Sequence, residues 1–127
     1  EIPSLVLAYI GDAVFELYVR MYLVEKGTAK VDRLNREASS LVRASSQADF
    51  LHRLEPLLTE EERDVARRGR NAKPGTVPKN ADLVQYRIST GFEALLGYLF
   101  LGQKEKRLKF LLDYLFNEAV QEVGKDY

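Results

Sequence analysis

The most informative stretch for the fold is Gly91-Phe92-Glu93-Ala94-Leu95-Leu96-Gly97-Tyr98-Leu99-Phe100-Leu101, an almost unbroken apolar run with one carboxylate. The pattern predicts a helix that carries this block to Leu101 and is broken by Gly102. Glu93 is anomalous, because a carboxylate in an apolar setting must be paired, hydrogen-bonded or bound to a cation. Ser89 and Gly97 share its helical face and leave space for a ligand. A buried ion pair with Arg87 is the structural alternative, and spacing alone slightly favours it.

A second carboxylate lies in Tyr9-Ile10-Gly11-Asp12-Ala13-Val14-Phe15-Glu16, within a predicted helix that runs to about Lys26. Glycine is unfavourable inside a helix, so Gly11 indicates a close approach of backbone or ligand. Asp12, Glu16 and Arg20 follow at four-residue steps and share one face. For Glu16, an ordinary intrahelical pair with Arg20 is as good an interpretation as a functional one. Asp12 has no comparable local reason to be there.

The rest of the chain also reads as helix, and we predict an all-α fold in a single domain over residues 1–127. Strand alternation and hairpin turns are missing. Thr59 and Glu62 have capping-box spacing. The expected segments are a first helix opened by Pro3 and Ser4, a second capped by Asp32 and running to about Val42, a third from Ser45 or Ser46 to Leu54 ended by Pro56, a fourth from Thr59 to near Gly69, a loop from Arg70 to Lys79, a fifth capped by Asn80, and a last helix fading around Gly124.

Composition excludes several classes of protein. Cysteine is absent, which rules out disulfides, thiolate catalysis and Cys-ligated zinc. The absence of cysteine also favours a cytoplasmic location. The most apolar stretch is too short to span a bilayer, so no membrane partner is expected. There is no glycine-rich phosphate loop, and the one histidine, His52, has no partner at metal-ligand spacing. The chain begins at Glu1 rather than Met, so a short native segment is expected before it.

Charge is balanced overall but unevenly distributed. Nineteen basic and nineteen acidic residues cancel, yet six cations face one anion between Arg63 and Lys79. Gathered cations on a helix end and a flexible loop can follow a nucleic-acid backbone whose shape is being read. A solvated basic face is the alternative, and binding is moderately favoured over it. The predicted contacts are Arg67, Arg68, Arg70, Asn71, Lys73 and Lys79.

Two carboxylates from different helices can together hold a hard divalent ion. Magnesium prefers oxygen ligands, keeps several waters and needs few protein groups. In phosphodiester hydrolysis such ions activate water and stabilise the attacking and leaving oxygens. Asp12 and Glu93 are the candidate pair.

Together, Tyr9-Ile10-Gly11-Asp12-Ala13-Val14 and Phe92-Glu93-Ala94-Leu95-Leu96-Gly97 resemble the two signature helices of the ribonuclease III endonuclease domain. The segments 68–73, 78–82 and 86–95 look like the Mini-III subgroup, which resembles a bare endonuclease domain without the double-stranded RNA-binding domain. The chain ends too soon to hold that domain. The resemblance implies Asp12 and Glu93 as catalytic residues and metal ligands, with Mg²⁺ (Mn²⁺ possible) as cofactor. It further implies a homodimer with RNA across it, one active site per subunit, and a role in maturing the large-subunit (23S) ribosomal RNA precursor.

The sequence departs from the family pattern at two positions. Family members carry an acid where this chain has Ala8 and another where it has Thr90. Glu16, Asp82 and extra waters are the candidates for completing the metal shell. The leading hypothesis is a hydrolase that cuts both strands of double-stranded RNA and leaves 5′-phosphate ends. The alternatives are a non-catalytic module that binds double-stranded RNA on the same fold, and a helical dimerisation protein with no RNA role.

Overall fold

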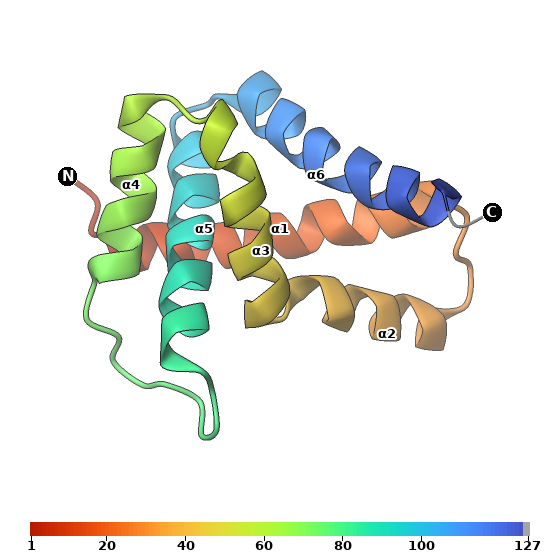
Figure 1. Cartoon of the computed structure of the whole chain (residues 1–127), viewed down its shortest axis with the longest axis horizontal. Helices are drawn as coiled ribbons and strands as arrows, with labels where there is room; N and C mark the ends of the chain where they lie inside the picture. The colour runs from red at the N-terminus through yellow and green to blue at the C-terminus, as the bar shows by residue number, and fades with distance from the viewer. Residues whose placement is uncertain (126–127) are drawn as a thin grey trace.

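The predicted all-α fold is confirmed. The computed structural model describes residues 1–125, with side chains described as far as Asn117, and this range contains no strand. Its elements are α1 (Ser4–Glu25), α2 (Val31–Val42), α3 (Ala44–Leu54), a 3₁₀ turn η1 (Glu55–Leu57), α4 (Glu60–Asn71), α5 (Leu83–Leu101) and α6 (Glu105–Lys125). Helix α5 stands at the centre, with α3 and α4 on either side of it, α1 crossing it and α6 running across one end (Figure 1).

Helix α5 is the spine of the hydrophobic core. Phe92 is fully buried and meets the buried ring of Phe15 from α1 edge-on, with 5.0 Å between ring centroids. The amphipathic pattern of α6 closes the core from another side, because its leucines are fully buried. The central apolar block of the sequence is therefore buried by three neighbouring helices and capped by a fourth. Among the described helices, none has the length and apolar character needed to traverse a bilayer.

Helices α1 and α5 touch backbone to backbone where they cross. A Cβ atom on Gly11 would lie 1.7 Å from the backbone oxygen of Glu93, and one on Gly97 would lie 1.9 Å from that of Leu7. Real Cβ atoms do not approach other atoms so closely, so only glycine fits at either position. The close approach that Gly11 indicated is therefore a contact with the helix that carries Glu93.

Several predicted helix ends are wrong by one to three residues. Helix α5 is capped by Asp82, whose carboxylate accepts from the Gln85 amide at 3.1 Å, and not by Asn80. Asn80 instead has φ = 70°, a left-handed conformation that asparagine tolerates in turns. Asp32 lies inside the first turn of α2, which begins after Lys30 without a side-chain cap. Other shifts are small: α3 starts at Ala44, Pro56 lies within η1, and α4 continues past Gly69 to Asn71.

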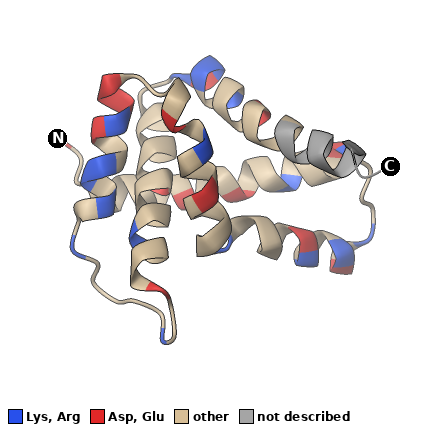
Figure 2. Cartoon of the chain, viewed as in Figure 1, with Lys and Arg blue, Asp and Glu red and all other residues tan. Residues whose placement is uncertain are grey.

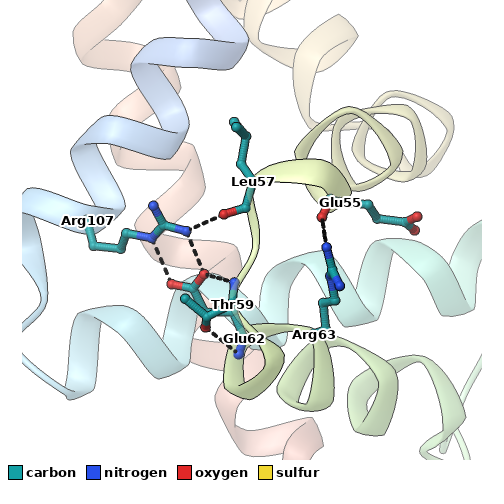
Figure 3. Close-up of polar contacts among 6 residues, drawn as sticks. All are labelled: Glu55, Leu57, Thr59, Glu62, Arg63 and Arg107. Atoms are coloured by element: carbon teal, nitrogen blue, oxygen red, sulfur yellow. Dashed lines mark hydrogen bonds and ion pairs between the residues drawn. The ribbon is translucent and has the colours of Figure 1, made fainter.

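A buried ion pair fixes the start of α4. The predicted capping box is present: Thr59 Oγ1 accepts from the Glu62 amide, and Glu62 accepts from the Thr59 amide. Arg107 of α6 donates to both carboxylate oxygens of Glu62, at 2.9 and 2.7 Å, and to the Leu57 carbonyl at 2.7 Å (Figure 3). One guanidinium thus ties α6, η1 and α4 together.

Candidate active site

The α1–α5 crossing brings the two predicted acids together. Gly11 rests against the backbone of Glu93, so its neighbour Asp12 lies beside the Glu93 carboxyl group. Asp12 is exposed and Glu93 is partly buried, and both line an open cleft of about 420 Å³ between α1, α5 and the α4–α5 loop. Residues 81 positions apart (93 − 12) therefore meet at one end of a solvent-filled cleft.

The Glu93 carboxyl group is strongly perturbed. Its pKa rises from 4.5 to about 8, first because of burial and then because of a hydrogen bond to Asp12 and the negative charge of Asp12. Glu16 raises the pKa further by its charge, whereas a hydrogen bond from the side chain of Gln47 lowers it. In the absence of a cation, the pair keeps a proton near neutral pH because two adjacent carboxylates do not both ionise easily.

The ion pair between Glu93 and Arg87 suggested by spacing is wrong. Both side chains line the cleft, yet they form no ion pair, and Arg87 does not contribute to the pKa of Glu93. Among the described residues, no cation pairs with Glu93. A proton or a cation from solution can therefore balance its charge.

Asp12 and Glu93 suit a magnesium ion chemically. Both are oxygen donors at the edge of an open cleft, where the ion can keep much of its water shell. Among the described residues, no group of three or more His, Cys, Asp or Glu side chains is arranged around one point as a closed metal cage. The pair fits an ion held by few protein groups better than one enclosed by many.

The two further candidate ligands lie differently. Glu16 is one turn along α1 from Asp12 and close enough for its charge to act on Glu93. The alternative pair of Glu16 with Arg20 does not form, although both line a small hollow against α2. Asp82 lies eleven positions from Glu93 on α5, roughly 16 Å along the helix axis, and its carboxylate already caps that helix. The structure does not bring Asp82 to the pair.

The positions where the family carries additional acids also face the cleft. Ala8 and Thr90 both line it, next to Asp12 and Glu93 respectively. The Thr90 hydroxyl donates to the Tyr86 carbonyl at 3.0 Å, so it is already satisfied. Neither residue supplies a carboxylate, and the space that a longer acidic side chain would fill is part of the cleft.

Four of the six predicted RNA-contacting residues lie in the C-terminal half of α4, where Figure 2 shows cations gathered while anions lie at the start of the helix. Arg67, Arg68 and Asn71 line a shallow hollow that shares Leu5 and Ala72 with the acidic cleft. Arg67 and Arg68 both pair with Asp64, the latter at 2.6 Å. Arg70 borders a second, apolar groove beside η1, which Arg67 also lines. Lys73 and Lys79 are exposed on the α4–α5 loop.

Three features of the cleft escaped prediction. Gln47 of α3 reaches Glu93, although nothing in the polar run Ser45-Ser46-Gln47 distinguishes it from a surface residue. The loop residues Ala72, Pro74, Gly75 and Thr76 form one wall of the cleft. Tyr86 holds this wall by a hydrogen bond from its hydroxyl to the Thr76 carbonyl at 3.4 Å. The loop composition predicted an irregular segment but could not show where the segment folds.

Comparisons with known proteins agree with the two signature helices and with the fold. A family model described as "Ribonuclease III domain" matches residues 5–104. A solved crystal structure of a protein from Fusobacterium nucleatum has a similar fold, with a TM-score of 0.84, 28% sequence identity and coverage of 94% of this chain and 95% of that one. The chain therefore belongs to the ribonuclease III family and is an endoribonuclease.

Sequence relatives narrow the assignment. A protein of Symbiobacterium thermophilum is 52% identical over 87% of this chain and 85% of its own length. One from Thermoanaerobacter sp. strain X514 is 49% identical over 89% and 80%, and one from Enterococcus faecalis is 43% identical over 98% and 93%. All three are named Mini-ribonuclease 3, and this chain belongs with them in the Mini-ribonuclease 3 branch.

Proposed function

We propose that this endoribonuclease is magnesium-dependent and cuts both strands of double-stranded RNA. The observation that carries the proposal is the pair formed by Asp12 and Glu93, which line one open cleft and form no ion pair with any cation among the described residues. The two carboxylates would hold the ion as ligands, and its positive charge would favour the ionised form of Glu93. Mn²⁺, which accepts the same oxygen donors, can take its place.

The residues of the cleft have separate roles in the proposed reaction. When bound, the magnesium ion supplies an activated water and stabilises charge on the attacking and leaving oxygens of the phosphodiester. Asp12 and Glu93 would hold the ion at the cleft that both line, and the charge of Glu16 would add to theirs. Arg87 lines the same cleft without an acidic partner, and we assign it to the phosphate that is cut. The expected products carry 5′-phosphate and 3′-hydroxyl ends.

The RNA is proposed to lie over the cleft and the C-terminal end of α4. Arg67, Arg68 and Asn71 border a hollow that continues from the cleft, so a backbone seated at Asp12 and Glu93 can reach them. Lys73 and Lys79 extend the positive charge along the loop, and Arg70 lies beside Arg67 at a neighbouring groove. Contacts of this kind read the backbone of a duplex and not its base sequence.

Two copies of the chain are proposed to bind one duplex. Helix α1 presents a stripe of exposed apolar side chains, and such a stripe on a soluble protein commonly marks an interface. Its members are Val6, Tyr9, Leu17, Met21 and Val24. A homodimer through α1 provides one active site per subunit, with RNA across the dimer. We propose the large-subunit ribosomal RNA precursor as substrate and the cytoplasm as location, on the family resemblance and the cysteine-free sequence.

A cleavage assay on generic duplex RNA tests the proposal. The wild type should cut the duplex with Mg²⁺ and should bind it without cutting in Ca²⁺. With a chelator it should neither bind the duplex tightly nor cut it. Asp12→Asn and Glu93→Gln should each lose at least about a hundredfold in rate while remaining folded. Asp32→Asn, which changes an exposed acid on α2, is the matched control and should cut normally.

The results of this assay also separate the competing functions. Metal-independent cutting, or full activity in both variants, would overturn the assignment of the pair. Tight, salt-sensitive duplex binding with no cleavage under any metal would favour the non-catalytic binding module. Absence of both binding and cleavage at low salt would reject double-stranded RNA as the substrate.

A further inference from the structure

A second groove lies between η1 and α4 and shares no lining residue with the acidic cleft. We call it the η1 groove, and its volume of about 580 Å³ is within the range of clefts that bind ligands. Its floor is apolar and is formed by Leu51 of α3, Leu58 after η1 and Ala66 of α4. The exposed Pro56 borders it. Among the described residues that line it, none belongs to α1, so it lies outside the dimer interface proposed above.

Three arginines of α4 stand along the η1 groove. Arg63, Arg67 and Arg70 follow at steps of four and three residues, so they share one face of the helix over about 10 Å of its axis. All three side chains are exposed. Among the described residues that line the groove, Glu55 is the one acid. The rim therefore carries an excess of positive charge above an apolar floor.

Two of these arginines have no acidic partner in the described part of the chain. Arg63 donates through Nε and Nη2 to the backbone carbonyl of Glu55, at 3.3 and 3.0 Å, which fixes the guanidinium without cancelling its charge (Figure 3). Arg70 makes no side-chain hydrogen bond or ion pair with a described residue, whereas Arg67 is paired with Asp64. The charges of Arg63 and Arg70 are thus available to an anionic partner.

The walls of the η1 groove are held in place before any partner binds. Helix α4 packs directly on α5 at the floor, because a Cβ atom on Gly91 would lie 2.6 Å from the Ala66 carbonyl oxygen. Arg107 ties η1 to the start of α4 by donating to the Leu57 carbonyl and to the Glu62 carboxylate. A groove that is already ordered loses less conformational entropy when a ligand binds.

The combination of charged rim and apolar floor favours a peptide over RNA. A duplex presents phosphates and sugars to a protein and has no large apolar group to place on such a floor. A peptide brings carboxylates and an apolar side chain together. Arginine binds carboxylates in bidentate geometry, and protein interfaces often combine arginine with apolar anchors. The arginine stripe of about 10 Å matches about three residues of an extended chain.

We propose that the η1 groove binds an acidic segment of a partner protein, with a large apolar side chain on the floor and carboxylates on Arg63 and Arg70. The proposal does not depend on metal-dependent cleavage. Arg67 lines both the η1 groove and the hollow that adjoins the acidic cleft, so a bound segment lies at the edge of the proposed RNA path.

Selection from a random peptide library displayed on phage, with the full chain as bait at physiological salt, tests the chemistry of the partner. We expect the enriched peptides to combine aspartate or glutamate with one large apolar residue. The most enriched sequence, made as a fluorescent peptide, is then titrated with the chain by fluorescence anisotropy. Replacing its acids by amides, or its apolar residue by serine, should each weaken binding by about tenfold or more.

Variants of the chain locate the bound peptide. Arg70→Glu reverses a charge on the rim, and Pro56→Glu places an acid at the apolar edge. Each should weaken peptide binding by about tenfold or more. Both positions are exposed, so thermal unfolding should show a Tm near that of the wild type. Lys30→Glu makes the same charge reversal at an exposed position at the start of α2, on the side of the molecule away from α4 (Figure 1), and should bind as the wild type does.

Several results would overturn the proposal. One is a selection that enriches no peptide, or only peptides without acids. Another is an equal peptide affinity of the wild type, Arg70→Glu and Pro56→Glu. If no peptide is enriched and both variants weaken the binding of duplex RNA, the groove belongs to the RNA path instead. None of these measurements uses a metal ion or cleavage, so the proposed nuclease function stands or fails separately.

Discussion

Glu93 is an acid whose charge, when it ionises, is not balanced by an ion pair with any described residue. Its carboxyl group lies beside Asp12 and within reach of the charge of Glu16. Arg87 is six positions earlier on α5, and side chains six residues apart on an α-helix point about 120° away from each other. This explains why the two share a cleft but form no ion pair. The acid is thus maintained in the fold at a cost to stability, as functional residues often are.

The cost should be visible as a pH dependence of stability in the metal-free protein. Glu93 ionises near its ordinary pKa of 4.5 when unfolded but holds its proton to about 8 when folded. The stabilising effect of the raised pKa is complete below 4.5 and is lost as pH rises toward 8. We expect the free energy of unfolding of Glu93→Gln, which stays neutral, to exceed that of the wild type by on the order of 1–2 kcal/mol at pH 8. This difference is smaller than a fully buried carboxyl group would give, because Glu93 keeps some contact with solvent. Urea unfolding in chelator at pH 5, 6.5 and 8 measures the difference.

Glu25→Gln, at an exposed position near the end of α1, should show no such pH-dependent gain. Addition of Mg²⁺ at pH 8 should stabilise the wild type and leave Glu93→Gln nearly unchanged. Equal stability of the wild type and Glu93→Gln at pH 8 without metal would contradict the perturbed state of this carboxyl group.

The sequence predicted Asp12 and Glu93 because each sits in a helix where a lone acid has no local use, and because the two motifs occur together. It could not predict the burial of Gln47. That burial depends on how α3 packs against α5, a long-range arrangement that leaves no periodic signal in the residues around it. Asp82 was a candidate metal ligand, but its local role as the cap of α5 is sufficient to explain an acid at this position.

At the scale of helices, the α1–α5 crossing sets the geometry of the site. The glycines at this crossing let the two backbones touch, and this contact fixes the spacing between Asp12 and Glu93. Gly11→Ala places a methyl group 1.7 Å from the Glu93 carbonyl oxygen, and a backbone cannot move aside as a flexible side chain can. We expect a loss of about 3 kcal/mol or more in the free energy of unfolding, at the upper end for overpacked cores.

Gly75→Ala is the matched control, because a Cβ atom at Gly75 would meet nothing within 4 Å. It should change stability by no more than about 0.5 kcal/mol. Urea denaturation of the two variants side by side provides the comparison. If Gly11→Ala is as stable as Gly75→Ala, the two helices do not cross as closely as described.

The Glu62–Arg107 pair makes a prediction of opposite pH dependence. The hydrogen bonds from Arg107 hold the pKa of the buried Glu62 carboxyl group below its usual value. The stability from this group is therefore present above pH 4.5 and is lost as the pH falls through the lowered folded pKa. We expect Glu62→Gln to lower the free energy of unfolding by roughly 3 kcal/mol at pH 7 and by much less at pH 3. The value at pH 7 is at the low end for a buried pair, because Arg107 is partly exposed.

The neighbouring exposed residue offers the control for this pair. Glu60→Gln removes an acid from the same first turn of α4 but touches no ion pair, and its cost should stay below about 1 kcal/mol. Circular dichroism in urea at pH 3, 5 and 7 distinguishes the two variants. An equal cost of Glu62→Gln at pH 3 and pH 7 would show that packing, and not the ionised pair, is what the residue provides.

Helix boundaries show how far local sequence rules extend. The capping box at Thr59 was predicted correctly because both partners lie within one turn and need no other part of the fold. The cap of α5 was assigned to Asn80 instead of Asp82, because the loop before it offers several residues able to cap and its path is set by contacts with the rest of the molecule. The burial of α5 followed from composition alone.

At the scale of the whole molecule, overall charge was the least informative feature of the sequence. Equal numbers of acids and bases suggest no nucleic-acid partner, yet the fold separates them. Asp12 and Glu93 lie in the cleft, while the cations of α4 lie along an adjoining hollow. The clustering of cations in sequence predicted part of this surface. The structure was needed to show which of these cations adjoin the cleft.

The exposed face of α1 leads to the last prediction. Leu17 is 56% exposed and Met21 47%, and they lie one turn apart on the helix whose other face carries the core. A second copy of the chain can cover this stripe symmetrically, because a two-fold axis pairs the same patch with itself.

Leu17→Glu places a charge at the centre of the proposed interface, and burying an unpaired charge there is strongly unfavourable. We expect the variant to sediment as a monomer at micromolar concentration, where the wild type is a dimer. Duplex cleavage should fall with dimerisation, because each RNA then meets one active site and half of the positive surface. Val31→Glu, at an exposed apolar position on α2, should remain dimeric and active. A wild-type monomer, or a dimeric Leu17→Glu, would move the interface away from α1 and leave its apolar face to another partner.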